Sequence, residues 1–231
     1  KVNHMNNQGT VTSGINQFYA KVYGFLGGGL AISAVISYLA LQVYPQQVFT
    51  FIRNFPLGFT GLWLIELILV VVLGVKAAKN PSLAIGGFIA YSILNGLTLA
   101  VTLAWYDIGS ITKAFITATG MFLGMSLVGV FTKKDLSGVG RAGMAALIGV
   151  IIAMILNVFI LRSSAVELFI SLLLVVIFAG ITAYDNQKIR TVYLQSNGSA
   201  HSGIAVFLAL QLYLDFINLF LAFLRIFGRN N

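Results

Sequence analysis

The segment Ile204–Leu224 reads IAVFLALQLYLDFINLFLAFL, and it decides how the whole chain is interpreted. It is about as long as the roughly 20 apolar residues that a helix needs to cross the hydrocarbon core of a bilayer. Asp215 lies near its centre. Because a charge at that depth costs roughly 2.5–3.5 kcal/mol on insertion scales, this aspartate indicates a functional site.

The rest of the chain repeats the apolar pattern, since 58% of the residues are hydrophobic and 9% are charged. In lipid the backbone polar groups must be satisfied within each segment, so each span is expected to be a helix. We therefore predict an all-α polytopic membrane protein, a bundle of seven transmembrane helices. The predicted spans are Tyr23–Leu41, Pro56–Val75, Leu83–Trp105, Ala114–Phe131, Ala142–Leu161, Val166–Tyr184 and Ile204–Leu224.

The connections between spans are short and leave no room for a soluble domain. We predict a polar N-terminal segment over residues 1–22 and one transmembrane domain over residues 23–231. The longest connections are 42–55 and 185–203, and the sixth helix is expected to continue slightly beyond its span. No cleavable signal peptide is recognised, so the first span is expected to remain as a helix.

The net charge of +8 comes from basic residues in the connections rather than from a soluble basic face. This arrangement favours membrane lipid as a partner and argues against nucleic acid. Seven spans place nine basic residues on the side of the N-terminus and five on the other side, which predicts a cytoplasmic N-terminus and an outer C-terminus. The sequence identifies no protein partner.

Several chemistries are excluded by composition. The chain has no cysteine, and its two histidines, His4 and His201, lie outside the spans, so neither disulfides nor a histidine metal site nor any cofactor is expected. Small residues at helical spacing predict close helix packing. These small-residue faces are Gly24 with Gly28, Gly29 with Ser33 and Ser37, and Gly120 with Gly124.

Glu66 is a second carboxylate within an apolar segment, in the middle of the second span. It must face the bundle or water, or be protonated. We consider two roles: an acidic oxygen along an ion path, or a carboxyl group hydrogen-bonded between helices. Asn95 and Asn157, in the third and fifth spans, are expected to form hydrogen bonds between helices.

Gln211, Asp215 and Asn218 follow one another at i, i+4 and i+7, which places them on one face of the last helix. Oxygen and amide groups along a buried face are what a hydrated cation or a proton needs along its path. The alternative is a polar seam that fixes the register of the helix.

Asp185, at the end of the predicted sixth span, is the best partner for Asp215. Two carboxylates brought within a few ångströms cannot both ionise at low cost, so the pair is expected to share a proton and to respond to pH. The alternative is that Asp185 is an interfacial residue paired with Lys188 at i+3. Asp185 is also predicted nearer the membrane surface than Asp215.

Two motifs resemble a known family: residues 212–220, LYLDFINLF, and residues 184–189, YDNQKI. They resemble the C-terminal motifs of the bacterial branch of the transmembrane Bax inhibitor motif family, the Bax inhibitor-1 and YccA group. The resemblance covers essentially the whole chain. It implies two three-helix layers around a central C-terminal helix, and a calcium leak that responds to pH.

The same resemblance implies roles for individual residues. Asp185 and Asp215 match a paired-aspartate sensor and gate, and Glu66 matches a glutamate of the second span. Bacterial channel members have an arginine after that span that latches onto the aspartate of the last helix. No arginine follows the span here, and Lys76 and Lys79 are the candidate replacements.

The leading hypothesis is thus a pH-gated passive cation leak in a bacterial cell membrane, with calcium and protons as the interacting ions. In-span carboxylates are too few for tight calcium binding, so any calcium at Asp185 and Asp215 is expected to be transient. The alternatives are a proton-coupled transporter and a non-conducting membrane stress or regulatory factor. We do not expect an enzyme, because neither aspartate lies in the Gly-Xaa-Gly-Asp motif of an intramembrane aspartyl protease.

Overall fold

The computed structural model describes residues 2–55, 58–196, 198 and 200–228, and every regular element in these residues is helical. The elements are α1 (Val2–Tyr38), η1 (Leu39–Val43), α2 (Pro45–Asn54), α3 (Gly58–Lys76), α4 (Pro81–Leu103), α5 (Ile108–Phe131), α6 (Ser137–Leu156), η2 (Asn157–Leu161), α7 (Ser164–Gln195) and α8 (Ser202–Phe227). The two η segments are single π-helical turns that continue the helices before them.

Six helices in the described residues are long and apolar enough to cross a membrane, and they correspond to six of the predicted spans. These six are Ser13–Val43, Pro81–Leu103, Ile108–Phe131, Ser137–Leu161, Ser164–Gln195 and Ser202–Phe227. The remaining predicted span coincides with α3, an apolar helix of 19 residues that is not among the six. Its predicted first residue, Pro56, lies outside the described residues.

The predicted connection 42–55 contains a short helix, α2, that the sequence pattern did not indicate. Pro45 occupies the first turn of α2, where its missing N–H has no partner to lose. The aromatic side chains of Phe49 and Phe51 are exposed. Ten residues are too few to span a bilayer, and exposed aromatic rings on a short helix are typical of the membrane interface.

The polar N-terminal segment is continuous with the first span, because α1 runs from Val2 to Tyr38 without a break. At the other end of the chain, α7 continues to Gln195, ten residues beyond Asp185. The predicted extension of the sixth helix is therefore confirmed and is longer than expected. Asp185 lies well inside a helix rather than at its end.

The helices group into two compact units. Unit 1 comprises residues 1–105 and 192–210, and unit 2 comprises residues 106–191 and 211–231. Both α7 and α8 contribute residues to each unit. The sequence pattern predicts one transmembrane domain and does not indicate this division.

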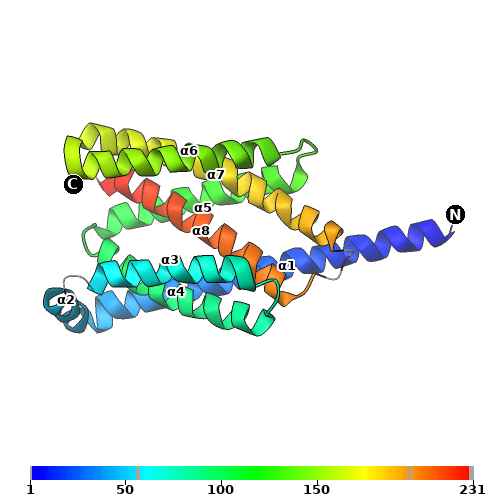
Figure 1. The fold of residues 1–231 in the computed structure, drawn as a ribbon, viewed down its shortest axis with the longest axis horizontal. Coiled ribbons are helices and arrows are strands. Elements are labelled where there is room, and N and C mark those ends of the chain that lie inside the picture. The colour runs from blue at the N-terminus through cyan, green and yellow to red at the C-terminus, as the bar shows by residue number, and fades with distance from the viewer. Residues whose placement is uncertain (1, 56–57, 197, 199, 229–231) are drawn as a thin grey trace. The chain divides into compact units, whose positions relative to one another are not determined.

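In unit 1, α4 packs against α1 and α3, which run beside it in Figure 1. The predicted small-residue face of α1 forms the contact: Ser33 Oγ donates to the Ser92 carbonyl at 2.7 Å, and Ser37 Oγ donates to the Gly96 carbonyl at 2.6 Å. The other two predicted faces show no such packing. A Cβ atom built at any of their glycines meets no atom within 4 Å.

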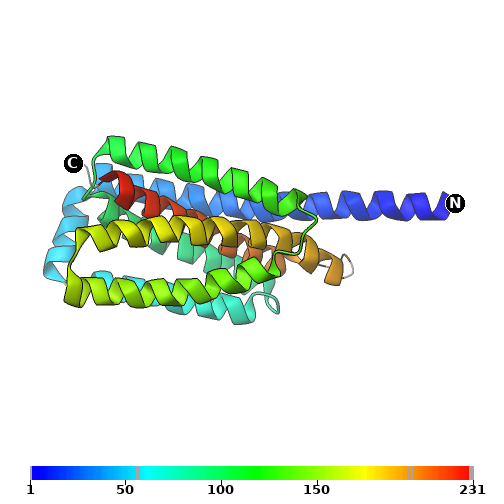
Figure 2. The ribbon, with the colours of Figure 1, turned by 90° about the horizontal axis from the view of Figure 1, so that it is seen from above.

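In unit 2, α6 and α7 form the antiparallel pair seen in Figure 2, joined through η2. Gly140 of α6 lies directly under the ring of Tyr184, and Gly129 of α5 lies against the carbonyl of Ala183. On α8, the ring of Phe216 packs edge-on against Phe115 at 5.9 Å between ring centroids. The two glycine contacts hold α7 against α6 and α5, and the ring contact joins α8 to α5.

The last helix is the most enclosed of the candidate spans. In its apolar window 67% of the residues are buried, against 11% for the span that begins at Ser137. Such burial fits an interior helix, because a lipid-facing helix keeps one side exposed. The arrangement of the bundle in two layers stays a prediction from the family resemblance.

Candidate functional site

Asp185 on α7 and Asp215 on α8 lie in unit 2 and are both buried, with 6% and 3% of their surfaces exposed. They are near enough to interact electrostatically, and Lys188 interacts in the same way with each of them. The difference in depth that the sequence predicts between Asp185 and Asp215 stays a prediction, although α7 continues ten residues beyond Asp185. The structure thus brings together the two aspartates selected from the sequence.

One oxygen of the pair has no hydrogen-bond partner in the part of the chain that the structure describes. Asp215 Oδ2 is buried and accepts no hydrogen bond from any described residue. An unsatisfied buried acceptor costs about 1–3 kcal/mol, and more when it carries charge. Native structures rarely keep such a group unless a proton, water or ion can reach it.

The residues that flank Asp185 explain how it is held in place. Asn186 Nδ2 donates to Ser126 Oγ on α5 at 3.0 Å. Gln187 accepts from the Leu136 N–H and donates to the Lys134 carbonyl, both at 2.8 Å, and so ties α7 to the connection between α5 and α6. Asn186 and Gln187, the two residues after Asp185, are therefore hydrogen-bonded to α5 and to the connection between α5 and α6.

Lys188 is the cation of the site. Its Nζ donates to Gln211 Oε1 on α8 at 3.0 Å and lies 5.9 Å from the centre of the Tyr184 ring. The i+3 spacing from Asp185 predicted an interaction with that residue, but it gave no indication of the contact with α8. The site therefore combines two carboxylates, one amide oxygen and one ammonium group.

Glu66 belongs to unit 1, where it forms a polar seam between α3 and α4. Its side chain is 5% exposed. Oε2 accepts from Asn95 Nδ2 at 3.2 Å, and Oε1 accepts from Thr98 Oγ1 at 2.8 Å. This geometry matches the hydrogen-bonded role considered for Glu66, and it confirms the expected hydrogen bond of Asn95 between helices.

The other predicted site residues lie apart from this cluster. Asn218 donates to the carbonyl of Leu214, one turn back on its own helix, at 2.7 Å. Lys76 and Lys79, the candidate latch residues, are exposed at the end of α3 and in the turn that follows, in unit 1. Within unit 2, the cation beside the aspartates is Lys188.

In the part of the chain that the structure describes, no three histidine, aspartate or glutamate residues gather in a group that could hold a metal ion. For a cation at this site, the protein offers the two carboxylates of the pair and the amide oxygen of Gln211. Calcium takes roughly six to eight oxygen ligands. An ion at this position would have to keep much of its water.

Apolar helices long enough to span a bilayer, with a buried carboxylate pair between two of them, define a polytopic membrane protein with an intramembrane acidic site. The profile of the family described as inhibitor of apoptosis-promoting Bax1 matches residues 15–231. The chain belongs to this Bax inhibitor family, as its C-terminal motifs predicted.

The chain is also similar to individual bacterial proteins over nearly its whole length. An uncharacterized membrane protein of Streptococcus pyogenes serotype M1 is 45% identical over 218 residues, which cover 94% of this chain and 95% of that protein. The inner membrane protein YbhL of Escherichia coli (strain K12) is 38% identical over 220 residues, 94% of this chain and 93% of its own. The protein YrjE of Lactococcus lactis is 43% identical over 217 residues, 94% and 92% of the two chains.

Proposed function

We propose that this chain is a passive calcium leak of a bacterial cell membrane, gated by pH through Asp185 and Asp215. The observation that carries the proposal is the buried aspartate pair, one of whose oxygens has no hydrogen-bond partner among the described residues. Membership of the Bax inhibitor family and the inner-membrane name of the YbhL relative support the location. The N-terminus is assigned to the cytoplasm on the bias of basic residues.

The pair acts as the gate because its charge changes with pH. With both carboxylates ionised, α7 and α8 carry like charges against each other; with one proton shared, the pair is held by a hydrogen bond. The two states favour different separations of the helices. Since Asn186 and Gln187 anchor α7 to its other neighbours, the change falls on the contact between α7 and α8.

In this proposal Lys188, rather than an arginine after the second span, is the cation that interacts with the aspartate of the last helix. Its ammonium group interacts electrostatically with both aspartates and donates a hydrogen bond to Gln211, so its positive charge opposes the entry of a cation at this site. Lysine is a compact point charge on a flexible stem, which suits a group that moves aside. Replacing it with an uncharged side chain of similar length should therefore increase the flux.

The test uses the full chain in liposomes loaded with a calcium-sensitive dye, with the rate of calcium entry followed over a pH series. The wild-type protein should carry a flux that changes with pH, and Lys188→Met should raise the rate. Lys134→Met is the matched control, because Lys134 is exposed in the connection after α5. A wild-type rate equal to that of empty liposomes at every pH would refute the leak, and equal rates for the two lysine variants would refute the role of Lys188.

A further inference from the structure

A cavity of about 320 Å³ opens at the end of unit 2 where α7 begins. It is lined by Met154, Asn157, Val158, Arg162, Ser163, Ser164, Glu167, Ile170 and Arg225. A smaller cavity of about 140 Å³ shares Ser164, Glu167 and Arg225 with it and extends the polar lining to Tyr106. The volume of the larger cavity is at the small end of the range of ligand pockets, roughly 300–1,000 Å³.

This cavity is separate from the aspartate pair. Arg162 and Asp185 are 23 residues apart along the chain, and the 21 helical steps from Ser164 to Asp185 correspond to about 30 Å at 1.5 Å per residue. Along α8, Arg225 and Asp215 are ten residues apart, or about 15 Å. The lining lies where three candidate membrane spans end or begin, near Leu161, Ser164 and Phe227. The gating proposal uses none of its residues.

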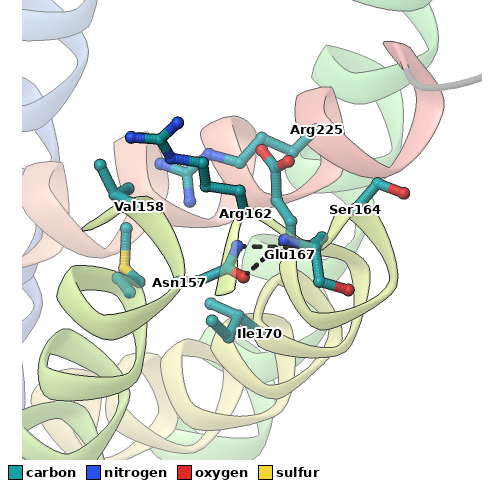
Figure 3. Close-up of a pocket in the computed structure, with 9 residues that line it drawn as sticks. Asn157, Val158, Arg162, Ser164, Glu167, Ile170 and Arg225 are labelled. Carbon is teal, nitrogen blue, oxygen red and sulfur yellow. Dashed lines mark hydrogen bonds between the residues drawn. The ribbon is translucent and has the colours of Figure 1, made fainter. Parts of the chain in front are cut away.

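Two guanidinium groups from different elements reach the cavity. Arg162 follows η2, and Arg225 lies in the last turn of α8; in Figure 3 both side chains extend toward the same side of the pocket. Glu167 lines the same cavity, with its carboxylate drawn beside the Arg225 side chain in Figure 3, and among the described residues no ion pair joins it to either arginine. The lining therefore carries one net positive charge.

The backbone holds Arg162 in an unusual conformation. Its φ of 46° is left-handed, which costs a non-glycine residue roughly 1–2 kcal/mol. Asn157, buried below it, secures the next residue from both sides: Nδ2 donates to the Ser163 carbonyl at 3.2 Å, and Oδ1 accepts from the Ser163 N–H at 3.1 Å. A buried asparagine thus maintains the turn that presents Arg162 to the cavity.

We propose that this cavity binds a phosphate group. Arginine forks bind phosphate oxygens through paired, charge-assisted hydrogen bonds, and a single net positive charge matches the single negative charge of a phosphodiester. The Glu167 carboxylate in the same lining repels a phosphate and so limits the affinity that the two arginines provide. The phosphate comes from an anionic lipid headgroup or from the free ion in solution, and the two sources are separated by experiment.

The experiment measures lipid retention by native mass spectrometry of the full chain in detergent, with phosphatidylglycerol and, separately, phosphatidylcholine added. The melting temperature with inorganic phosphate is measured in parallel. Arg162→Gln and Arg225→Gln should each weaken binding at least about tenfold, the effect of losing one charge-assisted hydrogen bond. Lys113→Gln removes an exposed charge of α5 outside the cavity and should bind as the wild type does.

Retention of phosphatidylglycerol that is lost only in the arginine variants assigns a lipid headgroup. A rise of the melting temperature with inorganic phosphate alone, again lost in those variants, assigns the free ion. Glu167→Gln should tighten binding about two- to fivefold by removing a repulsive charge, a gain that misfolding cannot produce. Binding that is absent in the wild type, or equal in the arginine variants and Lys113→Gln, overturns the proposal.

Discussion

Replacing Asp215 with asparagine should make the protein more stable. The substitution keeps the size of the side chain and removes a buried carboxylate whose Oδ2 has no hydrogen-bond partner in the described residues. It also replaces repulsion from Asp185 with an amide that can donate to that carboxylate. An unsatisfied buried acceptor costs about 1–3 kcal/mol, and for a protein of this length each kcal/mol shifts the melting temperature by about 2–4 °C.

The expected rise in melting temperature is therefore about 2–12 °C, measured for the detergent-solubilised protein. It should be larger in alkaline than in acidic buffer, because the wild-type pair relieves its repulsion by binding a proton in acid. Asp107→Asn is the matched control: Asp107 is exposed and caps α5 by accepting from the Ser110 N–H at 2.9 Å, which asparagine also does. No rise for Asp215→Asn, or a rise independent of pH, would refute the reasoning.

Three further predictions concern packing and charge elsewhere. Thr98→Val removes the hydrogen bond to Glu66 and should lower the stability by about 0.5–1.5 kcal/mol in thermal unfolding; no loss would contradict the seam between α3 and α4. Gly129→Ala places a methyl group against the backbone of α7 and should cost about 1–3 kcal/mol, whereas Gly124→Ala meets no atom within 4 Å and should cost far less. Hydrogen bonds from Ser137, at the start of α6, lower the pKa of exposed Asp135 below its ordinary value of 3.8. The contribution of Asp135 to stability is therefore complete above pH 3.8 and is lost as the pH falls through the lowered pKa. An NMR titration that gives a pKa of 3.8 or more for Asp135 would contradict this.

The sequence predicted the helices well because span length and apolar character are local properties. It missed α2 because ten residues of mixed polar and apolar character fall below the length of a span. It placed Asp185 at the end of its span because polar residues follow it, although α7 continues to Gln195. A polar sequence marks the end of the membrane, not the end of a helix.

The sequence predicts which two aspartates form the site, but it does not predict the hydrogen bonds that surround them. Asp215 was identifiable because a carboxylate is costly in an apolar segment, and Asp185 because it lies at the end of the neighbouring predicted span and can pair with Asp215. The hydrogen bond from Lys188 to Gln211 joins residues 23 positions apart on different helices, so it depends on how α7 and α8 pack. The cavity beside Arg225 has the same origin, since its lining comes from four elements, α6, η2, α7 and α8.

The most direct test of the central claim is the pH profile of calcium flux in proteoliposomes for the wild type, Asp185→Asn, Asp215→Asn and the double variant. If the two carboxylates titrate as one unit, each single variant should flatten the profile and the double variant should add little to either, because removing one member already removes the shared proton. Effects of the two substitutions that simply add, or single variants that keep the wild-type flux and profile, would contradict a gate formed by the pair.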